Sequence, residues 1–192
     1  MLERLSEKFA GKLIRAGVIA ESDADVYRYG FFQCTMLILN VLTTLLLGVL
    51  FQQLLLCILL NAAYIPIRMN AGGHHAKSPL RCYVNSTAMI AILMAMIKWI
   101  PFYPVIFFIL LVLSSLCIWC FAPVETENNP LDSLEKKIYR RRSRAVLLAE
   151  IVASLLLFTF TRYQIAVVIV LALFTEAIML LYGILTQPRK SN

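Results

Sequence analysis

Six apolar stretches, separated by shorter polar connections, limit what this chain can fold into. A helix needs about 20 apolar residues to cross a bilayer, and about 17 at the short end. The stretches lie at about 30–51, 54–67, 83–97, 99–121, 145–161 and 164–185. The second and third are marginal in length, so they must tilt or use the polar loop between them. We therefore predict an all-α integral membrane protein with about six transmembrane segments, organised as one polytopic domain over 1–192.

The composition agrees with a membrane protein and argues against a soluble domain. Apolar residues make up 60% of the 192 residues and charged residues 15%, whereas soluble domains average about 45–50% and 25%. The net charge of +7 suits basic loops lying against anionic lipid, so we expect membrane lipid, and no nucleic acid, as a partner. Four of the five cysteines lie in apolar stretches, which argues against a disulfide framework.

The N-terminal arm, residues 1–28, begins with an amphipathic pattern. Apolar residues recur at helical spacing over 2–20, and most charged residues fall between them. Such a helix is expected to lie in the membrane interface, or to pack on a neighbouring loop. The arm has no uninterrupted apolar run, so we expect no cleavable signal peptide. Ser22, followed by Asp23 and Asp25, predicts a cap and an acidic first turn for the next helix.

Lysine and arginine concentrate in alternate connections between the apolar stretches. The arm, the central loop (68–82), the long basic loop (122–144) and the C-terminus hold sixteen of them, and the other three connections hold two. Cytoplasmic loops carry the excess of Lys and Arg. We therefore predict that both termini and both of these loops lie in the cytoplasm, even if the second and third stretches are re-entrant.

The central loop holds the residues that look most like chemistry. It contains both histidines of the chain, His74 and His75, and Cys82 follows seven residues after the second. A thiol and an imidazole are the groups that a cysteine peptidase needs. Seven residues of straight helix rise about 10.5 Å, which is too far for a hydrogen bond, so the chain must fold back between them. Gly72 and Gly73 permit sharp turns there.

The residues before Cys82 predict the start of a helix. Ser78 suits the N-cap and Pro79 the first helical position. Cys82 would then be the fourth helical residue, near the positive end of the helix dipole and beside Arg81, and both features favour the thiolate. His75 could take the thiol proton and return it to a leaving amine. Asn85, one turn later, could orient His75 or make a structural hydrogen bond.

Several other interpretations of these residues stay open. A metal site from His74, His75 and Cys82 lacks a fourth ligand at a familiar spacing, so we expect no metal and no cofactor. Cys117 and Cys120 form a C-x-x-C pattern inside an apolar stretch, where packing is a commoner role than redox chemistry. A non-catalytic transporter or peptide chaperone, and a Cys-dependent membrane acyltransferase, are the competing functions.

The central loop resembles the accessory gene regulator B family, the membrane peptidases of Gram-positive quorum sensing. The likeness extends to the arm, through the residues IAESDADVY and Tyr29-Gly30, and covers nearly the whole chain. The loop residues that match the family pattern are Arg68, Ala71-Gly72-Gly73, His75-Ala76-Lys77 and Cys82.

The resemblance implies a specific activity. Such proteins remove the C-terminal tail of a short precursor peptide in the cytoplasm, with Cys82 as nucleophile and His75 as base. Arg68 and Gly73 would shape the site. The peptide would stay on the enzyme as a thioester until its own Cys or Ser closes a thiolactone or lactone ring. The precursor is expected to have an amphipathic N-terminal helix and an acidic tail, and the enzyme to form a homodimer.

Two sets of charged residues lie outside the central loop. We hypothesise that a basic cluster attracts the acidic tail; contact with anionic lipid and the control of topology are the alternatives. Glu150 and Glu176 are the only acids well inside the last two apolar stretches, and could pair with neighbouring groups or mark a substrate cavity. The basic cluster is Lys136, Lys137, Arg140, Arg141 and Arg142.

Overall fold

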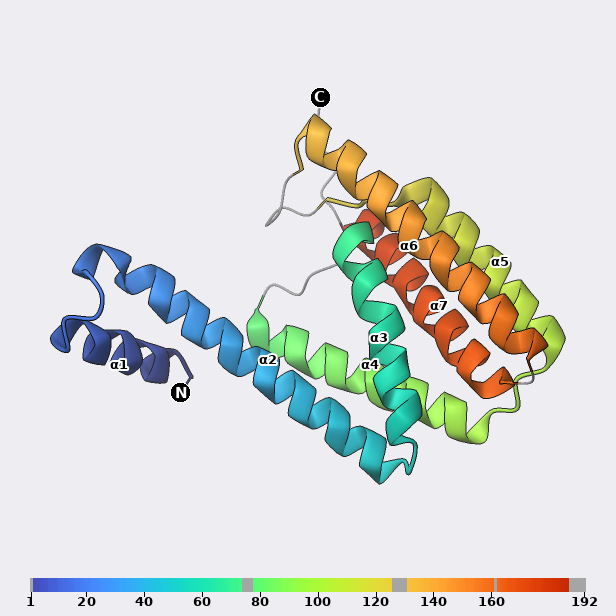
Figure 1. Ribbon diagram of the computed structural model, residues 1–192, viewed down its shortest axis with the longest axis horizontal. Helices are drawn as coiled ribbons and strands as arrows, with labels where there is room; N and C mark the ends of the chain where they lie inside the picture. Colours follow the sequence, from blue (N-terminus) through green and yellow to red (C-terminus); the bar gives the residue numbers. More distant parts are fainter. Residues whose placement is uncertain (1, 74–77, 126–130, 161, 187–192) are drawn as a thin grey trace. The chain divides into compact units, whose positions relative to one another are not determined.

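The computed structural model describes residues 2–73, 78–125, 131–160 and 162–186. In these residues it contains helices and no strand, which confirms the predicted all-α class (Figure 1). The chain divides into two compact units, Met1–Thr44 and Leu45–Asn192. The elements are α1 (Leu2–Arg15), the 3-10 turn η1 (Glu21–Asp23), α2 (Ala24–Leu50), α3 (Leu54–Ala71), α4 (Pro79–Trp99), α5 (Pro104–Phe121), α6 (Ser133–Thr159) and α7 (Tyr163–Thr186).

In the first unit, the predicted amphipathic helix forms α1 and packs on the start of α2. Phe9 stacks on Phe31 with 4.3 Å between ring centroids, and Ala10 is buried. The predicted Ser22 cap is wrong, because the chain enters α2 through η1. Ser22 lies inside that turn, and its hydroxyl donates to the Asp23 carboxylate at 3.2 Å.

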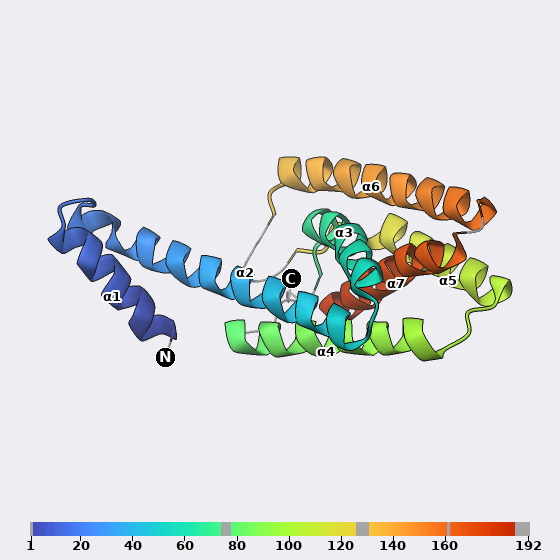
Figure 2. The ribbon, with the colours of Figure 1, turned by 60° about the horizontal axis from the view of Figure 1, so that its bottom comes forward.

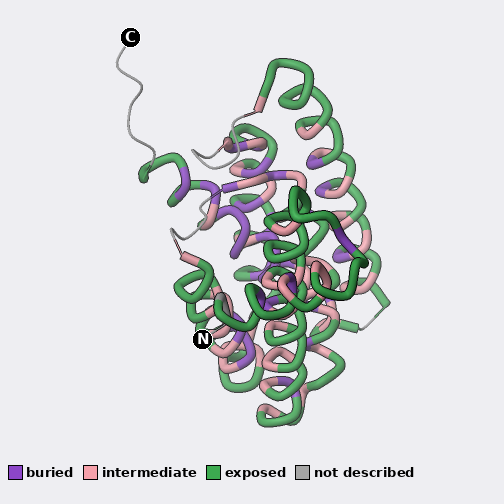
Figure 3. Tube along the Cα trace, turned by 90° about the vertical axis from the view of Figure 1, so that its left-hand side faces the viewer, coloured by how far each residue is buried: buried purple, intermediate pink, exposed green. Residues whose placement is uncertain are grey.

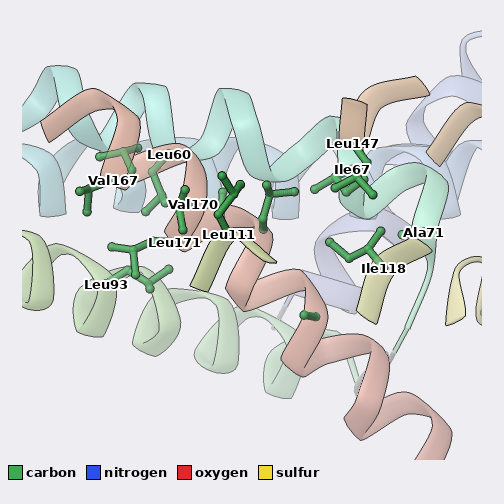
Figure 4. Packing of buried hydrophobic residues seen from close by; sticks show 14 of the residues in the cluster. Leu60, Ile67, Ala71, Leu93, Leu111, Ile118, Leu147, Val167, Val170 and Leu171 are labelled. Carbon is green, nitrogen blue, oxygen red and sulfur yellow. The ribbon is translucent and has the colours of Figure 1, made fainter. Parts of the chain in front are cut away.

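In the second unit, α7 is the central helix and packs against α3, α4, α5 and α6 (Figure 2). It is apolar on all sides, which is typical of a helix enclosed by others. Leu171 and Val170 of α7 lie among Leu60 of α3, Leu93 of α4 and Leu111 of α5 (Figure 4). Buried residues gather in this interior, and the outer helix faces are exposed (Figure 3).

Within the described ranges, five helices are long and apolar enough to cross a membrane: the continuous helix Glu21–Leu50, α3, α4, α5 and α7. The second and third predicted segments gain the length that they need from the central loop, which confirms one of the two predicted solutions. In the structure α3 continues through Arg68 to Ala71, and α4 already starts at Pro79. The predicted fifth segment forms the apolar second half of α6, whose first half is basic, so a sixth span stays a prediction.

The basic residues 136–144 lie on a helix and not in a loop, which corrects the predicted loop over 122–144. A capping box starts α6: the Asp132 carboxylate accepts from the Glu135 N–H at 2.6 Å, and the Glu135 carboxylate accepts from the Asp132 N–H at 3.1 Å. Lys and Arg are good helix formers. Of the predicted loop, the described residues outside the helix are 122–125 and 131–132.

A turn at Gly72 and Gly73 ties the end of α3 to the segment that follows α5. The Val124 N–H donates to the Ala71 carbonyl at 2.9 Å, and the Gly73 N–H donates to the Val124 carbonyl at 3.3 Å. Both glycines have positive φ, 77° at Gly72 and 104° at Gly73. A Cβ at Gly72 would collide with the carbonyl oxygen of Val124. This turn therefore requires glycine for both its backbone conformation and its close approach.

We predict that Gly72→Ala lowers the free energy of unfolding by about 1–3 kcal/mol, because alanine is strained at this φ and clashes with Val124. Thermal unfolding of the detergent-purified protein would measure this as a lower midpoint. Gly30→Ala is the matched control, since Gly30 is helical and a Cβ there meets nothing within 4 Å. Equal midpoints for the two variants would contradict the prediction.

Candidate active site

Cys82 lies in the first turn of α4, with the local structure that its neighbours predict. The Ser78 hydroxyl accepts from the Arg81 N–H at 3.3 Å, and Pro79 is the first helical residue. The Cys82 N–H donates to the Ser78 carbonyl at 3.0 Å. The Cys82 thiol is free and exposed. A capped helix start therefore presents an accessible thiol at its positive end.

The two histidines lie outside the described residues, so the predicted contact between His75 and Cys82 is not tested. The described chain resumes at Ser78 after Gly73, which bounds the histidine segment on both sides. Asn85 is exposed on α4, and its predicted role in orienting His75 stays a prediction.

The Arg68 guanidinium lies against the turn that contains Gly73. The Arg68 guanidinium Nη1 donates to the Gly72 carbonyl, and the Arg68 side chain is 17% exposed. A Cβ at Gly73 would lie 2.6 Å from the same Nη1 atom and 2.9 Å from the Met179 carbonyl of α7. Arg68 thus holds the turn from the α3 side, while the α7 backbone closes the space on the other side of Gly73.

Glu176 of α7 pairs with Arg68, a partner that the sequence alone does not identify. Its side chain is fully buried, and its Oε1 lies 3.7 Å from Arg68 Nη1. Among the described residues, neither Glu176 oxygen has a hydrogen-bond donor. The sequence offered one signal, an acid in an apolar helix that needs a basic partner, but it did not identify the partner.

Tyr64 is a further polar residue on α3. It lies one turn before Arg68 and is half-buried. Its spacing of four residues from Arg68 places the two on one helix face, and this was the available sequence signal. Tyr64 and Arg68 therefore lie on one face of α3, and Arg68 pairs with Glu176 of α7.

The predicted tail-binding residues lie on the first half of α6 and are all exposed. Lys136 is engaged within the chain, because its Nζ lies 3.0 Å from the Glu125 carboxylate. Arg144, nearby on the same helix, packs over the Trp119 ring at 4.3 Å and donates to the Trp119 carbonyl at 3.3 Å. Arg144 therefore joins α6 to α5, while the arginines at 140–142 face outward.

The C-x-x-C pattern of α5 holds two free cysteines. The Cys117 thiol donates to the Ala177 carbonyl of α7 at 3.7 Å, and Cys120 is exposed. The Cys117 contact agrees with a packing role between α5 and α7.

Comparison with known proteins places the chain in a family. The family model described as Accessory gene regulator B matches residues 6–180, a range that contains Arg68, Cys82 and Glu176. No curated protein and no solved structure matched the chain significantly. With its apolar helices, the chain is a membrane protein of the accessory gene regulator quorum-sensing system, in which this family takes part in autoinducer processing. It belongs to the accessory gene regulator B family.

Proposed function

We propose that this protein is a membrane-embedded cysteine endopeptidase that removes the acidic C-terminal tail of a quorum-sensing precursor peptide. The observation that supports this most is the free, exposed thiol of Cys82 in the first turn of a capped helix. The segment with both histidines lies directly before that helix. The family match supports a processing role in autoinducer maturation.

The proposed reaction has two acyl transfers. His75 takes the proton from Cys82, and the thiolate attacks the scissile carbonyl of the precursor. The tail leaves as an amine that takes this proton from His75, and the rest of the peptide remains as a thioester on Cys82. A Cys or Ser side chain within the peptide then attacks the thioester. Its proton returns to Cys82, and a thiolactone or lactone ring is released.

A thiol nucleophile suits this sequence because a thioester keeps the acyl group activated. Passing it to a second thiol exchanges one thioester for another, so ring closure needs no ATP if tail release drives the reaction. A site at the membrane surface that excludes water would slow the competing hydrolysis of the thioester. Arg68 and Gly73 would act by holding the turn that leads into the histidine segment.

We predict that Cys82→Ala and His75→Ala prevent tail removal when each is co-expressed with the precursor. Loss of a nucleophile stops the reaction, and loss of a general base slows it by about 10²–10⁴-fold. Mass spectrometry of the precursor measures the tail, and a covalent adduct with the wild type, absent from Cys82→Ala, would identify the thioester. His74→Ala and Cys34→Ala are matched controls that should still cut. A Cys82→Ala variant that inserts and cuts would favour the non-catalytic alternatives.

We further propose that both termini and residues 68–82 lie in the cytoplasm. With Cys82 as the sole cysteine, a membrane-impermeant maleimide should then label it only after the cells are lysed. The single cysteine of an Ile100→Cys variant, between α4 and α5, should instead be labelled in intact cells, because that connection is predicted on the outer side. The opposite labelling pattern would invert the topology.

We also propose that the arginines at 140–142 bind the acidic tail. Changing all three to Glu should slow cleavage of the natural precursor about tenfold, an effect of two or three lost exposed charge pairs. A precursor with a Lys-rich tail should recover the lost rate with this variant. Charge reversal at Lys8, Lys12 and Arg15 of α1 is the matched control. Unchanged processing by the inserted triple variant would leave lipid contact and topology as the role of the cluster.

A further inference from the structure

We propose that Glu176 is a positioning residue for the peptidase: it holds Arg68, and Arg68 holds the Gly72-Gly73 turn that leads into the histidine segment. This inference rests on the proposed function. The contacts that support it run from Glu176 on the enclosed helix α7, through Arg68, to the backbone of the turn that precedes the histidine segment.

The burial of Glu176 is the first step. An acidic side chain inside an apolar helix is costly and is retained where a partner or a function requires it. Glu176 is fully buried in α7, and the Arg68 guanidinium is the cation within ion-pair distance of its carboxylate in the described chain. The Glu176 charge therefore acts through Arg68.

A single guanidinium nitrogen connects the carboxylate to the turn. Nη1 of Arg68 lies 3.7 Å from Glu176 Oε1 and also donates to the Gly72 carbonyl. Without the carboxylate, this nitrogen would lose the negative charge that faces it inside the protein. Arg68 has a long, flexible side chain that could then turn toward water, and the Gly72 carbonyl would lose its donor.

The backbone of α7 touches the same turn. Met179 follows Glu176 by three residues, and its carbonyl lies so close to Gly73 that a Cβ there would be only 2.9 Å away. Consecutive turns of α7 thus provide the carboxylate for Arg68 and the surface on which Gly73 rests. Val124 holds the turn from a third side. A displacement of Arg68 would disturb this turn, which directly precedes the histidine segment in the sequence.

Packing alone does not require this pair. The contacts of α7 with its neighbours are dominated by buried apolar residues, and neutral residues of similar size often replace a buried ion pair without loss of stability. Glu150 of α6 offers a comparison inside the same protein. It also has a buried carboxylate oxygen, but it forms no ion pair among the described residues.

The test uses two rates, measured on inserted full-length protein. The first is tail cleavage of the precursor, and the second is alkylation of Cys82 by a small maleimide when Cys82 is the sole cysteine. We expect Glu176→Gln to slow cleavage about 10²-fold, as expected for a misplaced catalytic group. The alkylation rate of Cys82 in Glu176→Gln should fall to that in His75→Ala, because a misplaced His75 no longer takes the thiol proton. Glu176→Asp keeps the charge and should recover part of both rates, while the matched control Glu150→Gln should leave both unchanged.

A double-mutant cycle with Arg68→Gln distinguishes a shared pathway from general disruption. Because both residues act through one pair, Arg68→Gln and Glu176→Gln together should alkylate no more slowly than Arg68→Gln alone. Additive losses, or equal losses in Glu150→Gln, would overturn the inference. If Glu176→Gln does not insert, two other variants decide the question. They are Glu176→Asp, which keeps the charge, and the double variant, which leaves neither charge of the pair without its partner.

The outcomes separate this inference from the proposed function. If the wild type does not shorten the precursor, the peptidase proposal fails. If the wild type cuts and Glu176→Gln cuts and alkylates at the same rates, the peptidase proposal stands and the role of Glu176 is overturned.

Discussion

The close packing of α7 among α3, α5 and α6 is the constraint on which the second unit depends. Lipid tails give apolar helices no hydrophobic reason to associate, so membrane helices are held by tight contacts and by paired polar groups. Small buried residues of α7 such as Ala172, Ala177 and Gly183 permit such contacts. The enclosure has a consequence for Glu176, since a carboxylate on this helix must find its partner inside the protein. Arg68, at the end of α3, is that partner.

Backbone polar groups place a second constraint on the same region. Where a helix ends near a membrane, its carbonyls and the N–H groups that follow need partners in the protein or in water. The Ala71 carbonyl and the Gly73 N–H both pair with Val124, beyond α5. These two hydrogen bonds bring together two connections that are distant in the sequence. The glycines, the arginine and the buried acid therefore form one structural unit and not four independent features.

The sequence predicted the features that depend on local pattern. Apolar length predicted the helix class, and Ser78-Pro79 predicted the start of α4, because capping needs only neighbouring residues. The apolar pattern left open how far α3 extends into the central loop, and it predicted a loop where the basic half of α6 forms, because both regions are polar. For α6 the spacing of Asp132 and Glu135 was a usable signal. The Arg68–Glu176 pair could not be predicted, because it depends on how α3 and α7 pack, which no local pattern encodes.

The two halves of α4 differ in a way that bears on the proposed reaction. Its buried residues, Ile90, Leu93 and Met94, lie in the second half and dock the helix in the core. The first turns carry the exposed Cys82 and contain no buried residue. The Gly72-Gly73 turn, by contrast, is held from three sides. In the proposed mechanism, the exposed first turns of α4 leave space for a peptide at Cys82, while a firmly held turn precedes the segment that carries the proposed base His75.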